Sequence, residues 1–355
     1  MRVRTRQHHS GIALIIVLLV IVVLGILAGG FAYSMKVETT LARHATFDTD
    51  LDWAGRSGVE VAKWVLAQSM TAPQGGIGSF KRQWGDFGMT NDILATVDLK
   101  NYELGDARLS IDIKDLDRKF NINVADEVIL RQAMTLIGVD AAASSTIIGS
   151  ILDWRDPDSN THLSGTESDY YESLDPPYFC KDGPIDDLTE LLLVRGVTPA
   201  MYWGSGGGGL PPVLNRRVSG LKSALDEPTY AVGLVDLFTP ISSRFVNINT
   251  ASATVLQIFP DIDEIVAQAI IARRAGPDGV EGTEDDMPFR SPAEIATVAG
   301  LNPAAVQAFG RYFSVRSFCF EVHISVDMRG TKREYVAILR RNGPKDIQTL
   351  NLHWR

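Results

Sequence analysis

An uncharged apolar segment near the start of the chain sets the strongest constraint on the fold. The 22 residues from Ile12 to Tyr33 contain no Asp, Glu, Lys or Arg. As an α-helix, with a rise of about 1.5 Å per residue, they extend for roughly 33 Å, enough to cross the hydrocarbon core of a bilayer. Arg2, Arg4 and Arg6 precede the segment and only Lys36 follows closely. The sequence therefore predicts one membrane span with the N-terminus in the cytoplasm.

The helical pattern continues beyond the apolar segment. Apolar or small residues recur at spacings of three and four, which is typical of an amphipathic helix: Val37, Leu41 and Ala45, then Leu51, Ala54, Gly58, Val61 and Val65. We therefore expect one helix from Ile12 to about Gln68, roughly 85 Å long. Its first half would lie in the membrane and its second half would pack on a soluble domain. The alternative is a secretory signal peptide cut at the small residues Ala28, Gly29 and Gly30.

Strand signals occur in two regions that are far apart in the sequence. Apolar residues alternate with polar ones at Ala107, Leu109, Ile111 and Ile113, and again at Phe318, Phe320, Val322, Ile324 and Val326. The stretch DMRGTKRE then predicts a turn, and YVAILR predicts a returning strand. Because a two-stranded ribbon alone is marginal in water, we expect both regions to join one antiparallel sheet that packs on the long helix. The alternative is a separate small domain at each end.

The region between these strands, residues 118–313, reads as a mostly helical insertion with an internal repeat. FNINVADEVIL (120–130) matches VNINTASATVL (246–256), and ELLLVRGV (190–197) matches EIATVAGL (294–301). In each copy the NINxA asparagines are expected to cap the helix that follows. A glycine-rich stretch at 204–217 predicts an exposed linker between the copies. The fold class is thus α+β, with a long N-terminal helix on an antiparallel sheet and a large helical insertion.

Each copy of the repeat resembles a helix-hairpin-helix (SAM-like) unit, many of which bind DNA phosphates. Nucleic acid is nevertheless disfavoured here. The turn FPDID of the second copy places two aspartates where a phosphate would lie. The chain carries a net charge of −9, which becomes −12 once the three leader arginines are removed, whereas nucleic acids attract basic proteins.

An acidic loop in the first repeat has the residue types of a calcium site. Five candidate ligands stand at positions one, three, five, seven and twelve of a calcium-loop pattern: Asp156, Asp158, Asn160, the backbone of His162, and Glu167. Asp169 follows closely and joins this candidate set. The sixth position holds Thr161 in place of the usual glycine, so the pattern supports oxygen ligands for calcium better than a true EF-hand. The alternative is a solvated acidic surface.

The second repeat has a shorter acidic loop, GPDGVEGTEDDMPF. Five carboxylates lie within nine residues: Asp278, Glu281, Glu284, Asp285 and Asp286. Like charges this close repel each other unless water or a cation offsets them. Calcium is again the expected ion, with a solvated surface as the alternative, and zinc is disfavoured because neither loop offers more than one histidine.

No catalytic constellation emerges from the sequence, which predicts a protein that is not an enzyme. The six histidines are scattered, and GxSxG, HExxH and P-loop patterns are absent. The two cysteines, Cys180 and Cys319, lie in different parts of the chain. In an oxidising compartment they could pair, and otherwise each is a small core residue.

The leader resembles that of type IV pilins and type II secretion pseudopilins, in which a prepilin peptidase cleaves after a glycine. Here the cut would follow Gly11 and leave Ile12 as the new, methylated first residue. With the repeats and the DWRDPD…GTE…DYY loop, the whole chain resembles the K-type minor pseudopilins. The resemblance implies a tip subunit that joins I- and J-type minor pseudopilins and the major pseudopilin filament. It also implies calcium in the inserted domain, and a single-pass inner-membrane protein whose bulk is periplasmic.

Ile16 adds to this resemblance. Pilin-like chains normally carry a glutamate five residues after the glycine, and K-type members typically lack it. Residue 16 is accordingly the candidate tip-determining position.

The predicted organisation has six parts. They are a leader (1–11), a membrane half-helix (12–33), the pseudopilin helix with the first strands (34–117), the first repeat with its loop and linker (118–245), the second repeat (246–313) and the last strands (314–355). The rival function is a membrane-anchored periplasmic DNA receptor, supported by Arg273, Arg274 and Arg290 and opposed by the acidic balance.

Overall fold

The computed structural model describes residues 10–71, 99–205, 229–283, 285–298, 301 and 309–355. By their internal contacts, residues 1–57 and 58–355 form two separate units. The predicted long helix is confirmed as α1 (Ser10–Thr71). Side chains of its apolar segment are exposed, with Ile16 at 57%. Within the described residues this is one helix long and apolar enough to cross a membrane.

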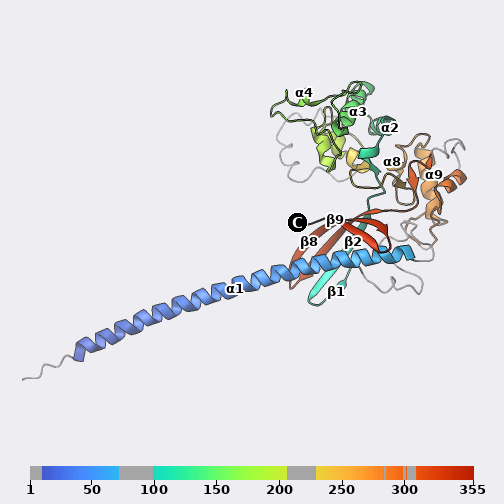
Figure 1. The fold of residues 1–355 in the computed structure, drawn as a ribbon. Coiled ribbons are helices and arrows are strands. Elements are labelled where there is room, and N and C mark those ends of the chain that lie inside the picture. Colours follow the sequence, from blue (N-terminus) through green and yellow to red (C-terminus); the bar gives the residue numbers. More distant parts are fainter. Residues whose placement is uncertain (1–9, 72–98, 206–228, 284, 299–300, 302–308) are drawn as a thin grey trace, which may run out of the picture. The chain divides into compact units, whose positions relative to one another are not determined.

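The predicted antiparallel sheet is confirmed and has five strands in the order β1-β2-β7-β8-β9 (Figure 1). Their bounds are β1 (Tyr102–Leu104), β2 (Ala107–Asp115), β7 (Cys319–Met328), β8 (Thr331–Gly343) and β9 (Asp346–Trp354). β2 pairs with β7 across more than 200 residues of sequence, with Ile111 opposite Ile324 and Ile113 opposite Val322. The outer strands β1 and β9 were not predicted, because neither shows a clean alternation of buried and exposed residues.

The end of α1, from Gly58 onward, packs on this sheet. Glycine is needed at position 58 because a Cβ there would lie 2.8 Å from Cγ2 of Ile324. The buried guanidinium of Arg341 donates hydrogen bonds to the Leu66 carbonyl at 3.2 Å and to Ser69 Oγ at 2.9 Å. It also donates to the Ser317 carbonyl at 2.6 Å. One arginine of β8 thus ties the last turns of α1 to the strand region.

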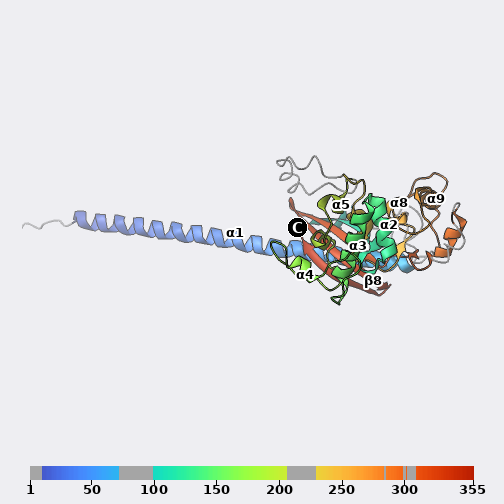
Figure 2. The same ribbon diagram turned by 90° about the horizontal axis from the view of Figure 1, so that it is seen from above.

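The regular secondary structure of the insertion between β2 and β7 is mostly helical, as predicted, although much of the insertion is loop. Its longest helices are α2 (Glu127–Ile137), α3 (Ala141–Arg155) and α9 (Glu264–Ala275), and α2 and α3 lie side by side (Figures 1 and 2). Shorter α-helices are α4 (Ser168–Tyr171), α5 (Pro199–Trp203), α7 (Leu234–Leu237) and α8 (Ala253–Leu256), and the 3-10 turns are η3 (Ile122–Val124), η4 (Leu188–Leu193) and η6 (Pro292–Thr297). Two parallel pairs of two residues were not foreseen: β3 (Phe120–Asn121) with β4 (Phe238–Thr239), and β5 (Val246–Asn247) with β6 (Phe313–Ser314).

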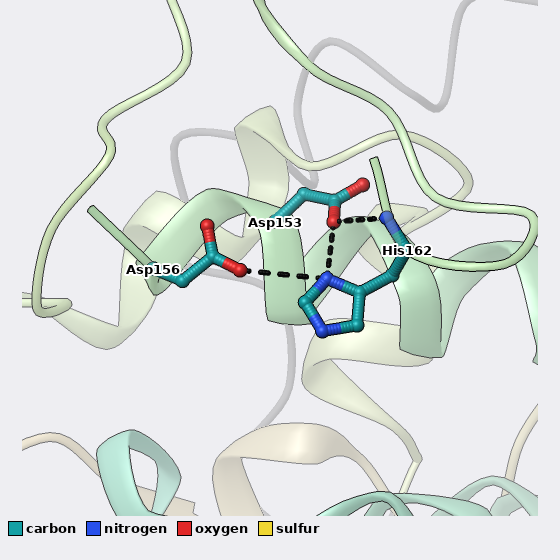
Figure 3. A group of neighbouring side chains, drawn as sticks. All are labelled: Asp153, Asp156 and His162. Carbon is teal, nitrogen blue, oxygen red and sulfur yellow. Dashed lines mark hydrogen bonds and ion pairs between the residues drawn. The ribbon is translucent and has the colours of Figure 1, made fainter. Parts of the chain in front are cut away.

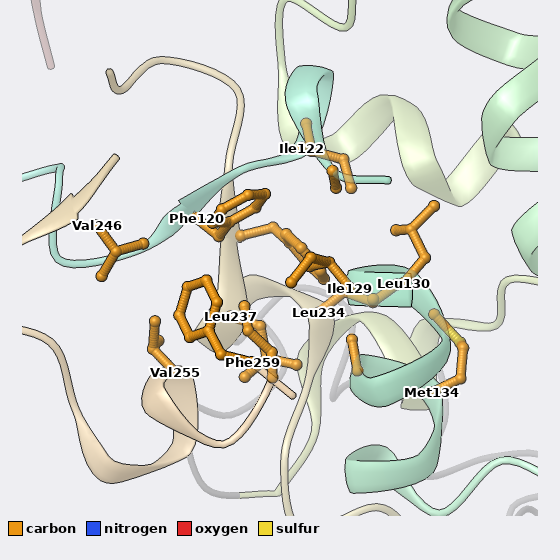
Figure 4. Close-up of a cluster of buried hydrophobic side chains, with 14 of the residues drawn as sticks. Phe120, Ile122, Ile129, Leu130, Met134, Leu234, Leu237, Val246, Val255 and Phe259 are labelled. Atoms are coloured by element: carbon orange, nitrogen blue, oxygen red, sulfur yellow. The ribbon is translucent and has the colours of Figure 1, made fainter. Parts of the chain in front are cut away.

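The two repeats share one hydrophobic core. Figure 4 shows side chains of the first repeat, such as Phe120 and Leu130, in the same cluster as Val255 and Phe259 of the second. The rings of Phe120 and Phe259 meet edge to face, with centroids 5.6 Å apart. Because this core contains residues from both copies, the insertion is one folded body and not two independent modules.

The second asparagine of each NINxA segment has a different role from the predicted one. Asn123 accepts a hydrogen bond from the Ile185 N–H at 2.8 Å and donates to its carbonyl at 2.9 Å. Asn249 makes the same pair of bonds with Phe289, at 2.8 and 2.9 Å. The following helices α2 and α8 are instead capped by Asp126 and Ser252. The predicted capping of α2 and α8 was therefore wrong for Asn123 and Asn249, whose carboxamides satisfy a distant backbone segment. Asn121 does cap the short turn η3, by accepting from the Asn123 N–H at 2.9 Å.

Each repeat also contains an arginine that holds its NINxA segment. Arg155, the last residue of α3, donates to the carbonyls of Ile122 and Ala125. Arg274, near the end of α9, donates to the corresponding carbonyls of Ile248 and Ala251, at 2.5 and 2.7 Å. The duplication is therefore preserved in individual hydrogen bonds, although the intervening loops differ in length.

A buried carboxylate joins the sheet to the insertion. Asp117 follows the end of β2, and its side chain accepts hydrogen bonds from the backbone N–H groups of Ser243, Phe318 and Cys319. Its own carbonyl accepts from the Asn247 N–H at 2.8 Å. Burial, followed by repulsion from Asp115, raises the pKa of Asp117 from 3.8 to about 6. One side chain thus holds together the segments that leave and re-enter the sheet.

The first prediction concerns the pH dependence of this junction. Because its pKa is raised in the folded state, Asp117 binds a proton more tightly in the folded than in the unfolded protein between about pH 4 and 6. The stability gained from protonating Asp117 is therefore complete below pH 4 and is lost as the pH rises through about 6. Two pKa units correspond to roughly 3 kcal/mol. Asp117→Asn should lower stability but flatten this part of the pH profile, measured by denaturant unfolding of the detergent-purified protein from pH 4 to 7.

The exposed Asp112, also on β2, provides a matched control, because Asp112→Asn removes the same charge without touching the junction. The control should keep the wild-type pH profile. An Asp117→Asn profile as steep as the wild type would contradict the assignment.

Candidate metal centre

The candidate site is built on the last turns of α3, where a loop packs directly against the helix. A Cβ at Gly149 would lie 2.7 Å from the Gly165 backbone nitrogen, and a Cβ at Gly165 would overlap Oδ2 of Asp153. Residues 149 and 165 must therefore both be glycine for the chain to approach this closely. The approach places the loop's backbone N–H groups within reach of the Asp153 carboxylate.

Asp153 organises this loop. Its fully buried carboxylate accepts hydrogen bonds from the backbone N–H groups of His162, at 2.8 Å, and Thr166. The His162 ring lies between two acids, with Nδ1 2.6 Å from Asp153 Oδ1 and 3.4 Å from Asp156 Oδ2 (Figure 3). Asp153, Asp156 and His162 thus form a first group of side chains with the composition of a metal site.

A second group lies around the same loop. One ligand atom from each of Glu167, Cys180 and Asp182 falls within 4.8 Å of the others. The Cys180 N–H donates to Ser168 Oγ at 3.0 Å, and its thiol contacts the Asp153 carbonyl at 3.7 Å. Burial raises the pKa of the Cys180 thiol to about 12. A neutral thiol is a poor ligand, so oxygen atoms are the useful donors of this group.

The electrostatics of the loop favour a cation. Burial, and then repulsion from Asp153, Asp182, Asp156 and Asp158, raise the pKa of Glu167 to about 7. Burial, with Asp158 next, also raises the pKa of Asp156. Glu167 Oε1 and Asp156 Oδ1 are buried and have no hydrogen-bond partner in the described part of the chain. A cation would stabilise both carboxylates, so the residues present fit a hard, oxygen-preferring metal ion.

The structure divides the predicted ligand set of this loop. Asp156, His162 and Glu167 lie in the two groups, although His162 contributes its imidazole and its carbonyl accepts from the Gly165 N–H. Asp158 caps its own turn by accepting from the Asn160 N–H at 2.7 Å, and both of these residues are exposed. Asp169 lies exposed on α4 and belongs to neither group.

Sequence reasoning missed two members of these groups, Asp153 and Asp182. Asp153 could have been found, because it lies three residues before Asp156 and therefore on the same face of a helix end. Asp182 could not have been found in this way, because its position near Glu167 depends on the path of the chain after Cys180.

The second acidic loop satisfies its carboxylates in another way. Asp285 accepts from the Asp278 N–H at 3.0 Å and from Thr283 Oγ1 at 2.7 Å, and these bonds lower the pKa of Asp285. Asp286 accepts from the Gly282 N–H at 2.9 Å. Glu281 forms an ion pair with the buried Arg274. These acids therefore do not gather into a three-residue group in the described part of the loop, and Glu284 lies outside the described residues.

The remaining predicted site residues are the two cysteines and three positions near the start of the chain. Cys180 and Cys319 are both free and buried, so the pairing considered from sequence is not formed. Cys180 lies in the core of the insertion, whereas Cys319 begins β7 opposite Arg340 of the sheet. Gly11, Ile12 and Ile16 all lie within α1.

Comparisons with known proteins give matches to two family models and to several relatives. The family described as "Type II secretion system (T2SS), protein K" matches residues 110–203, and the "Helix-hairpin-helix motif" matches residues 242–314. Type II secretion system protein K of Aeromonas hydrophila is 23% identical over 95% of this chain and 98% of its own length. The Klebsiella pneumoniae protein K is 22% identical over 55% of this chain and 60% of its own length.

The fold has a match among solved structures. A chain of the crystal structure of the GspK-GspI-GspJ complex, from the type 2 secretion system of enterotoxigenic Escherichia coli, has a TM-score of 0.59 and 16% identity. The match covers 88% of this chain and 99% of that one. The resemblance and fold class predicted from sequence are confirmed.

The second prediction tests the close packing of the loop on α3. Gly165→Ala places a methyl group against the Asp153 carboxylate, so the loop must move, and we expect a loss of roughly 2 kcal/mol or more in unfolding free energy. Gly183→Ala is the matched control in the same acidic region, because its Cβ would meet only the Lys181 carbonyl, at 3.7 Å. Equal stability of the two variants in denaturant unfolding would show that the loop is not held as described.

Proposed function

We propose that this chain is a minor pseudopilin of the type II secretion system protein K family, that it initiates or caps the periplasmic pseudopilus, and that its role is structural and non-catalytic. The proposed role in secretion is supported by the similarity to the Aeromonas protein K, which extends over nearly the whole length of both chains. The proposed location at the tip of the filament is supported by the apolar residue Ile16.

The argument from Ile16 is electrostatic. In the pilin-like families, the glutamate at this position is tolerated in an apolar filament core because it pairs with the N-terminal amine of the adjacent subunit toward the tip. A subunit at the tip has no neighbour beyond it, and an unpaired carboxylate in lipid costs about 2 kcal/mol or more. Isoleucine at position 16 removes that cost, and the bulky insertion would block a further subunit at the same end.

The proposed partners follow from the same family. The solved complex contains GspK, GspI and GspJ, and we assign I-type and J-type minor pseudopilins as the neighbours of this chain. The major pseudopilin filament would follow below them. Prepilin peptidase would cleave after Gly11, leaving α1 as a single inner-membrane anchor with the bulk of the chain in the periplasm.

Calcium is the proposed ion of the first acidic loop. Asp153, Asp156, Glu167 and Asp182 would hold it, and its charge would offset the repulsion among the carboxylates. The two buried oxygen atoms without hydrogen-bond partners in the described part of the chain, on Asp156 and Glu167, support this assignment.

Nucleic acid is not the proposed partner of the helix-hairpin-helix units. Asp261 and Asp263 stand at the hairpin turn of the second repeat, and Asp263 caps α9 by accepting from the Val266 N–H at 2.8 Å. A phosphate at this turn would meet negative charge.

The third prediction concerns processing. Mass analysis of the membrane-extracted protein should find Ile12 as the first residue, carrying an N-methyl group. A mature start near Phe31 would indicate an ordinary signal peptidase and would contradict the pseudopilin assignment.

The fourth prediction tests the tip position through Ile16. Ile16→Glu introduces a carboxylate without a partner, so we expect about 30-fold fewer filaments per cell, corresponding to about 2 kcal/mol. Ile16→Leu is the control and should assemble normally. Filaments counted by electron microscopy in equal number for both variants would show that position 16 is neutral.

The fifth prediction tests calcium. Glu167→Gln should weaken calcium binding at least tenfold and reduce the rise in melting temperature that calcium produces. Asp169→Asn is the control, because it removes one negative charge nearby from an exposed carboxylate outside both groups. Identical melting curves of the wild type with calcium and with chelator would reject the site.

A further inference from the structure

The strand β9 forms an edge of the sheet that other polypeptides can reach. In the described part of the chain it pairs only with β8, and most of its residues are exposed. The Arg355 N–H donates to the Glu334 carbonyl of β8 at 2.9 Å. Because successive residues of a strand direct their N–H and C=O groups to opposite sides, those of Leu352 and Trp354 point away from β8. They offer hydrogen bonds to an incoming strand.

This edge lacks most of the features that keep sheet edges from pairing. Proteins commonly blunt an edge with charges, proline or bulges. A bulge leaves Leu350 between the pairs Leu339–Thr349 and Ile338–Asn351. After it, the stretch from Asn351 to Trp354 has a regular register with β8, no proline and no Asp, Glu, Lys or Arg. The unprotected part of the edge is therefore at the end of β9.

The charge around this edge identifies the kind of partner. Residues 331–355 contain six basic and two acidic residues, a net charge of +4, whereas the whole chain carries −9 and the remainder therefore −13. Among the basic residues Arg341 is buried, and Lys332, Arg340, Lys345 and Arg355 are exposed. A second copy of this chain would bring an identical positive hairpin to the edge and be repelled. An acidic segment would be attracted.

We propose that the outer edge of β9 is a docking site for an extended, acidic segment of a partner subunit, which adds a strand to the sheet. Such strand addition gains affinity from main-chain hydrogen bonds, here at Leu352 and Trp354, and selectivity from neighbouring side chains. Trp354 is 62% exposed, and its ring is held under the Arg333 guanidinium at 4.9 Å. It thus presents a fixed aromatic surface beside the edge. The inference rests on the proposed function in one respect, namely that the partner is a minor pseudopilin of the I or J type.

Hydrogen–deuterium exchange resolved to single amides tests the proposal. The full chain in detergent would be compared with its complex with purified I- and J-type minor pseudopilins. The amides of Leu352 and Trp354 should exchange fast in the free chain and at least tenfold more slowly in the complex, while His353 and Arg355 stay protected in both. A complex that leaves Leu352 and Trp354 unprotected overturns the docking edge but not the proposed function. Absence of any complex contradicts the proposed function and this inference with it.

A charge-reversal pair separates electrostatic attraction from general damage. Lys345→Glu with Arg355→Glu should lower the association rate with the same partners about tenfold or more at low ionic strength. The control Lys114→Glu reverses an exposed charge on β2, on the far side of β7 and β8 from this edge, and should leave the rate unchanged. An equal rate for the double variant and the wild type would contradict the acidic nature of the partner.

Discussion

The buried carboxylate of Asp117 is the interaction on which the arrangement of the insertion and sheet depends. An insertion of about 200 residues leaves the sheet after β2 and returns before β7, so its entry and exit must be held side by side. The Asp117 carboxylate does this by accepting hydrogen bonds from Phe318 and Cys319 in the returning segment and from Ser243, just before the second repeat. The neighbouring Asp115 extends the junction through Thr250 and Ser317, each at 2.5 Å. Burying two acids together is costly, and the many donors around them offset that cost.

Within the insertion, the duplicated hydrogen bonds explain how one pattern can carry loops of different length. In each repeat an asparagine holds a distant backbone segment on both its N–H and C=O, and an arginine holds the NINxA carbonyls. The loop between these fixed points is free to vary. The first repeat uses this freedom to gather acidic side chains that fit a cation. In the second repeat, Asp286 instead accepts a backbone N–H and Glu281 pairs with Arg274.

The sequence predicted the elements whose signals are local. The span of α1, the alternating strands β2 and β7, the turn into β8 and the repeat were all readable from spacing. The edge strand β9 was not, because an edge exposes both faces and loses its alternation. Asn123 and Asn249 were misassigned because the residue type that caps a helix also forms hydrogen bonds with other free peptide groups. At the candidate site, Asp156 and Glu167 were predicted as side-chain ligands and lie in the two groups, whereas His162 takes part through its imidazole and not through the predicted backbone carbonyl. The division into two groups depends on Asp153 and Asp182. Those two residues meet the loop only through tertiary packing around Gly149 and Gly165.

Under the proposed function, this chain would occur once, at the end of a filament. The apolar residue at position 16 removes the charge that a repeated subunit would use, and the bulk of the insertion favours an end position. The most direct measurement is electron microscopy of assembled filaments carrying a gold label on the insertion. The account predicts a single label at one end of each filament. Labels distributed along the shaft, at many copies per filament, would contradict it.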